Sequence, residues 1–181
     1  MKHKTLSVRD ITIIGMLTAV LSVLSILQIP MPSGVPITLQ TFAVALCGYI
    51  LGVYRGILCV LLYLLLGLAG LPVFAGMSSG IGTLFGFTGG FLYAFPVLAG
   101  LCGIGARFYK KMPAMIFGIL GLFIFHAVGA FHYSVVASCG FRQGILLVSL
   151  PYLAKDILSV IGACLVSGSV KKAFSRAGIS L

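Results

Sequence analysis

Asp156 and its neighbour Lys155 are the side chains of this sequence best suited to polar chemistry. Asp156 is one of only two acidic residues among 181, and the pair lies inside a long apolar stretch. A charge near the centre of a membrane helix costs about 2.5–3.5 kcal/mol, so such a pair indicates a functional site. A carboxylate only accepts hydrogen bonds and an ammonium only donates them. Together they could bind a ligand that offers both a donor and an acceptor.

Consecutive residues on a helix point about 100° apart, so Lys155 and Asp156 are expected to have separate partners. In an alternative interpretation, each side chain bonds a neighbouring helix and only holds the bundle together. Two buried charges are costly for a purely structural purpose, which favours the functional interpretation.

The elements that must position this pair are membrane helices. Apolar residues make up 60% of the chain, charged residues 8%, and the mean hydropathy is +1.22. Soluble domains carry about a quarter charged residues. Apolar runs broken by Gly, Pro and charge therefore predict an all-α integral membrane protein with one transmembrane domain over residues 1–181. The six expected transmembrane helices are residues 11–29, 37–53, 56–71, 85–106, 113–137 and 144–170.

Basic residues lie mostly on one side of this six-helix arrangement. Ten of the twelve Lys and Arg lie there, whereas Arg142 lies on the other side and Lys155 lies within the sixth span. The positive-inside rule then places both termini in the cytoplasm. Because the basic residues are scattered over helix ends and form no continuous stripe, the net charge of +10 does not indicate nucleic-acid binding.

Enzyme and metal chemistry find little support in the sequence. P-loop, G-x-S-x-G and H-E-x-x-H motifs do not occur, and the five cysteines lie in or beside apolar runs without C-x-x-C spacing. His126 and His132 are six residues apart, which does not place them on one helix face. We expect no enzyme activity, no metal and no cofactor. ATP, if it drives this protein, would be hydrolysed by another chain.

Two long connections, residues 28–40 and 71–90, carry no charge at all. A plain solvated loop would carry Asp, Glu or Lys, so these segments are expected to fold back against the membrane part of the protein. Glycines there would let backbone amides approach a ligand closely. The alternative is a turn that merely packs. The expected ligand-binding residues in these connections are Thr38, Gln40, Gly76, Ser79 and Gly89.

Four stretches resemble the signature sequences of the BioY family. They are VPITLQTFAV at 35–44, LYLLLGLAGLPVFAG at 62–76, GFTGG at 86–90 and PYLAKDIL at 151–158. BioY proteins are the biotin-binding S components of energy-coupling factor (ECF) transporters. The resemblance implies the six-helix S-component fold in the bacterial plasma membrane. It also implies biotin as the transported ligand, with a transmembrane T protein and two ABC-type ATPases as partners.

Two positions depart from the family pattern. Phe87 replaces a proline, and the lysine that usually follows the acid is Ser159 here, while Lys155 precedes it. Biotin carries a ureido ring with two N–H groups and a carbonyl, and a carboxylate at its other end. Asp156 suits a ureido N–H, and Lys155 suits the carboxylate or another acceptor.

Gly15 and Ala19 on the first helix have the small-x-x-x-small spacing that lets a partner helix approach. The resemblance implies that this pair contacts the T protein, and packing within the same chain is the alternative. An alternative function is a self-sufficient proton-coupled carrier for a small carboxylate or vitamin, with Asp156 as its titrating group.

Overall fold

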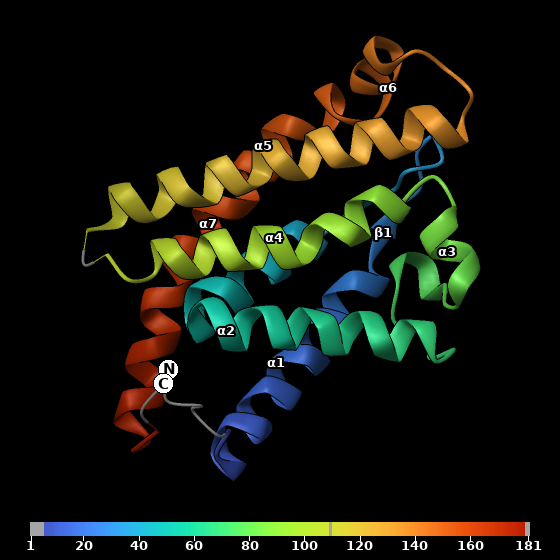
Figure 1. Ribbon diagram of the computed structural model, residues 1–181. Coiled ribbons are helices and arrows are strands. Elements are labelled where there is room, and N and C mark those ends of the chain that lie inside the picture. Colours follow the sequence, from blue (N-terminus) through green and yellow to red (C-terminus); the bar gives the residue numbers. More distant parts are fainter. Residues whose placement is uncertain (1–5, 109, 180–181) are drawn as a thin grey trace.

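The computed structural model describes residues 6–108 and 110–179, which are mostly helical (Figure 1). The first helix, α1 (Val8–Ile26), begins at a capping box. The Ser7 hydroxyl accepts a hydrogen bond from the Asp10 backbone N–H, and the Asp10 carboxylate accepts from the Ser7 backbone N–H. After α1 come two short antiparallel strands, β1 (Gln28–Ile29) and β2 (Ile37–Thr38).

The next helix, α2 (Gln40–Leu68), is broken at Gly52. Gly52 has φ 76° and ψ −173°, a conformation that side-chain-bearing residues rarely adopt. The sequence predicted two helices separated by a turn at residues 53–56. The turn instead lies at Gly52, and residues 53–56 already belong to the second helical segment.

The two segments of α2 lie side by side and antiparallel. The sulfur atoms of Cys47 and Cys59 are 3.6 Å apart across the break. A Cβ on Gly56 would lie 3.0 Å from the Cα of Gly48, so the absence of side chains allows this close contact. The chain therefore reverses its direction at Gly52.

The uncharged connection after α2 packs back on the helices, as the sequence predicted. It forms the short 3₁₀ helix η1 (Ala75–Met77) and the short helix α3 (Ile81–Phe85). Phe74 is buried and its ring occupies the space that a side chain on Gly67 would need. The Phe74 ring also contacts the Tyr63 ring edge-on, at 5.4 Å between centroids. Burial of Phe74 thus anchors the connection.

The remaining helices are α4 (Gly89–Gly105), α5 (Lys111–Val136), α6 (Phe141–Val148) and α7 (Leu150–Arg176). The single helix expected at 144–170 is two helices, because the chain turns at Ser149 between α6 and α7. In the described part of the chain, α1, α2, α5 and α7 are long and apolar enough to cross a membrane, and α4 is a shorter apolar helix. The protein is therefore an integral membrane protein.

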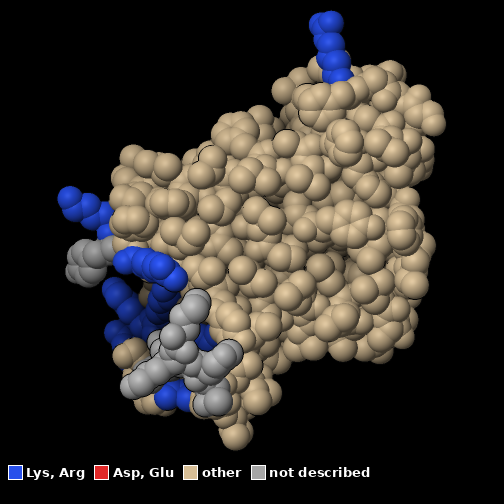
Figure 2. All heavy atoms as spheres, in the orientation of Figure 1, with Lys and Arg blue, Asp and Glu red and all other residues tan. Residues whose placement is uncertain are grey.

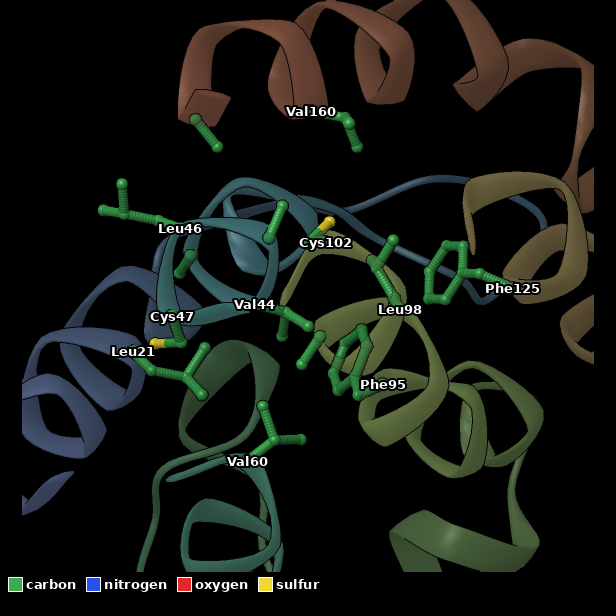
Figure 3. Close-up of a cluster of buried hydrophobic side chains, with 14 of the residues drawn as sticks. Leu21, Val44, Leu46, Cys47, Val60, Phe95, Leu98, Cys102, Phe125 and Val160 are labelled. Carbon is green, nitrogen blue, oxygen red and sulfur yellow. The ribbon is translucent and has the colours of Figure 1, made fainter. Parts of the chain in front are cut away.

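Helix α4 lies between α2 and α5 and forms the centre of the bundle (Figure 1). Figure 3 shows Phe95 and Leu98 of α4 among Val44 of α2 and Phe125 of α5, all of them buried. The rings of Phe95 and Phe125 are stacked, with centroids 5.6 Å apart. This apolar core separates the two ends of the bundle, which differ in their charge.

Basic side chains gather at the end of the molecule where α1 begins and α7 ends (Figure 2). There, Nη1 of Arg55 lies 2.7 Å from Oδ1 of Asp10, which joins the break in α2 to the start of α1. The strands, η1 and α3 lie at the opposite end (Figure 1). The positions of the basic residues agree with the asymmetry expected from the sequence.

Candidate ligand-binding site

A cavity of about 250 Å³ lies at the end formed by the strands and η1. It is lined by the β1–β2 hairpin, the start of α2, the connection around η1, and side chains of α4, α5 and α7. This volume is slightly below the range of roughly 300–1,000 Å³ that is typical of small-molecule pockets, so the cavity suits only a small ligand.

Lys155 and Asp156 project from α7 into this cavity and form an ion pair. The Lys155 Nζ lies 2.5 Å from Oδ1 of Asp156 and donates a hydrogen bond to the Thr38 backbone carbonyl at 3.0 Å. Each residue thus has a partner of its own, Thr38 for Lys155 and His126 for Asp156, but the two also contact each other, which their positions on the helix did not predict. A lysine has a flexible four-carbon stem, so its ammonium can swing across to the neighbouring acid.

His126 of α5 completes this polar cluster, and sequence reasoning missed it. Its Nε2 lies 3.3 Å from Oδ2 of Asp156, and the two residues are only 5% and 3% exposed. In the sequence, His126 stands out only by its spacing from His132, which does not suit a shared metal. A histidine in the middle of an apolar run was the available signal, but only tertiary packing brings α5 against α7.

Three atoms of the cluster lack a well-directed hydrogen bond within residues 6–108 and 110–179. They are Nδ1 and Nε2 of His126 and Oδ1 of Asp156. The Lys155 ammonium and the His126 ring still lie 2.5 Å and 3.3 Å from the two carboxylate oxygens, so the atom left without any such neighbour is Nδ1 of His126. Buried polar atoms are normally paired, and leaving one unpaired costs about 1–3 kcal/mol. A polar ligand could supply the missing partners.

Aromatic rings form an apolar wall beside the polar cluster. Phe91 and Phe95 of α4 and Phe125 of α5 all line the cavity. The ring centroids of Phe91 and Phe125 are 5.0 Å apart, and those of Phe91 and His126 are 6.2 Å apart. The cavity can therefore hold a ligand that has a polar head and an apolar body.

The loop between the strands is fastened to the helices around the cavity. The Tyr133 hydroxyl of α5 donates to the Ser33 carbonyl at 3.1 Å. The Tyr152 hydroxyl of α7 donates to the Val35 carbonyl and lies 2.9 Å from the Ser33 hydroxyl. These bonds hold the loop against α5 and α7, where it closes one side of the cavity.

The structure brings Thr38, Gln40, Lys155 and Asp156 together in the lining of the cavity. The other three expected residues, Gly76, Ser79 and Gly89, do not line the cavity. The residue that precedes each of them does, namely Ala75, Ser78 and Thr88. A Cβ on Gly76 would lie 2.1 Å from the Gln28 side chain, and one on Gly89 would lie 1.7 Å from the Leu84 carbonyl. These two glycines permit close packing near the cavity.

Gly15 and Ala19 lie on an exposed face of α1 and do not line the cavity. A Cβ on Gly15 would meet no described atom within 4 Å. Met16, Val20 and Val23 on the same helix are also exposed. The described part of the chain thus leaves this apolar face open and does not use it for packing within the bundle.

These features define an integral membrane protein with a small cavity among its helices. The chain belongs to the BioY family, because the family model matches residues 1–176. It is 38% identical over 154 residues to biotin transporter BioY2 of Lactococcus lactis subsp. cremoris, with 84% of each chain covered. It is 35% identical over 159 residues to biotin transporter BioY of Thermotoga maritima, covering 87% of this chain and 93% of the relative.

A solved structure agrees with these sequence relatives. The fold is similar to the crystal structure of the S-component for biotin from an ECF-type ABC transporter, with a TM-score of 0.83 and 26% sequence identity. That comparison covers 91% of this chain and 92% of the other.

Proposed function

We propose that this chain is the biotin-binding S component of an ECF transporter, a single transmembrane domain in the bacterial cell membrane that needs no cofactor. The observation that carries the proposal is the buried cluster of His126, Lys155 and Asp156 beside an aromatic wall in one cavity. Biotin has the matching parts, namely a polar ureido ring and an apolar body. Family membership and the biotin transporters among its relatives support the same ligand.

The ion pair favours a particular role for Lys155. Because its ammonium lies 2.5 Å from Asp156, both groups reach the same part of a bound ligand. A ureido ring offers an N–H and a carbonyl side by side, whereas the carboxylate of biotin lies at the far end of its chain. Asp156 accepts from the ureido N–H, and Lys155 donates to the ureido carbonyl.

Lys155→Ala is expected to lower the affinity for biotin and for biotin methyl ester equally, by about tenfold. This loss corresponds to one charge-assisted hydrogen bond. Equilibrium titrations of the purified protein would measure both affinities. A much smaller loss for the ester would assign Lys155 to the carboxylate instead.

A third ligand separates binding from a structural role of Lys155. In 2-iminobiotin a protonated guanidinium replaces the urea at neutral pH, so the lysine repels it. The wild-type preference for biotin over 2-iminobiotin should shrink in Lys155→Ala. A structural lysine would leave that preference unchanged.

The proposed topology has six crossings: α1, the two segments of α2, α4, α5 and α7. The reversal at Gly52 supports it by dividing α2 into two antiparallel segments. With the basic end in the cytoplasm, both termini are cytoplasmic and the cavity opens toward the outside. Biotin enters there, and a T protein with two ABC-type ATPases drives its import.

Uptake into reconstituted vesicles tests this division of labour. Biotin should accumulate only when the T protein and ATPases are present and ATP is inside the vesicle on their side. A self-sufficient proton-coupled carrier would instead accumulate biotin without these partners when a proton gradient is applied. The acid such a carrier would titrate, Asp156, is held in an ion pair here, which favours the transporter with ATPases.

A further inference from the structure

A second cavity, of about 400 Å³, lies at the basic end of the bundle. Its walls are the break in α2, the end of α4, the following turn and the end of α7. A Cβ on Gly103 would lie 2.5 Å from the Val53 backbone nitrogen, so α4 packs directly on the break and shapes one wall. This cavity is separate from the ligand-binding site.

Three cations line this cavity: Arg55, Arg107 and Lys171. Arg55 is paired with Asp10, and the only other acidic side chain in the sequence, Asp156, is paired with Lys155 at the opposite end. No acidic side chain is left for Arg107 and Lys171. Within the described residues, neither side chain has a hydrogen bond or ion pair.

Lys171 is half-buried, so its unpaired ammonium has lost part of its hydration. A partly desolvated cation without a partner is costly, and a bound anion would offset that cost. Apolar side chains of Ile50, Leu51 and Ile179 line the same cavity. Cations beside apolar surface suit an anion that carries hydrocarbon.

We propose that this cavity binds a phosphate group, and that its occupant is the headgroup of an anionic phospholipid. Basic pockets between helices on the cytoplasmic side of membrane proteins bind such headgroups. The site rests on the proposed topology, which places this end at the inner membrane surface. It is independent of biotin, because the two cavities share no lining residue.

The test uses native mass spectrometry of the full chain in neutral detergent. Phosphatidylglycerol and phosphatidylcholine are added to the wild type, to the double variant Arg107→Gln/Lys171→Gln, and to Arg142→Gln. Arg142 is an exposed cation on α6, so its variant makes a matched change away from the cavity. Biotin titration of the same samples monitors folding and tests the proposed function separately.

Wild type and Arg142→Gln are expected to bind phosphatidylglycerol in preference to phosphatidylcholine. In the double variant this preference should fall by about tenfold while biotin affinity stays unchanged. If inorganic phosphate competes with the lipid at equal concentration, the phosphate site stands but a lipid occupant is wrong.

Two results would overturn the proposal altogether. An equal preference for phosphatidylglycerol in all three proteins would mean that Arg107 and Lys171 bind no lipid in this cavity. The two cations would then only stabilise the negative ends of helix dipoles and set the orientation of the chain in the membrane. Absence of binding of both phosphatidylglycerol and inorganic phosphate to the wild type would mean that the cavity is not an anion site.

Discussion

Asp156→Asn is expected to leave the protein folded and to weaken biotin binding by roughly ten- to a hundredfold. The neutral amide accepts a weaker hydrogen bond and turns an N–H toward a ligand donor. It also removes the charge that holds the Lys155 ammonium and the His126 ring in place. Titration of purified wild type and variant with biotin measures the change.

The chain offers a matched control for this substitution. Asp10→Asn removes the only other acidic charge, and that carboxylate pairs with Arg55 at the opposite end of the bundle. Biotin affinity should be unaffected by it. Unchanged binding in Asp156→Asn, or an equal loss in both variants, would exclude Asp156 as a specific ligand contact.

Gly15→Leu and Ala19→Leu are expected to abolish assembly with the T protein and ATPases while the isolated variants bind biotin normally. The exposed face of α1 has room for the larger side chain within the chain, because a Cβ on Gly15 meets nothing within 4 Å. A partner helix that approaches the backbone at this face would collide with leucine. Co-purification of the ATPases, beside a biotin titration, measures the two effects separately.

Gly168→Leu provides the control for added bulk. Gly168 is also helical, and a Cβ there would likewise meet no described atom within 4 Å, but it lies on α7. Its variant should assemble normally. If Gly15→Leu loses folding and biotin binding together, the face packs within the bundle and the interface assignment is wrong.

The sequence predicted the helical membrane class. It also singled out Lys155 and Asp156, which the structure places in one cavity, because charge in an apolar chain is rare and conspicuous. It predicted the turn within α2 at residues 53–56, where charge and glycine interrupt the apolar run. The turn lies at Gly52 instead, where the backbone needs a positive φ that side chains disfavour. Local composition alone did not identify which residue would adopt it.

The polar cluster could be predicted only in part, because its geometry depends on packing between helices distant in sequence. His126 reaches Asp156 only when α5 contacts α7, and Lys155 reaches Thr38 across 117 residues. Gly76 and Gly89 were predicted to bind ligand because of their residue type. In the structure, neighbouring atoms occupy the space beside both glycines. Ala75 and Thr88, the residues just before them, line the cavity instead. In a tight turn, a shift of one residue determines which side chain lines the cavity, and the sequence pattern does not give that register.

Equilibrium titration of the purified, detergent-solubilised wild-type protein with biotin tests the central claim most directly. We expect saturable binding of one biotin per chain, unaffected by the absence of any partner protein. The signal should be displaced by unlabelled biotin and strongly reduced in Asp156→Asn. Absence of saturable binding by protein whose helical content and thermal unfolding show it to be folded would contradict the proposed function.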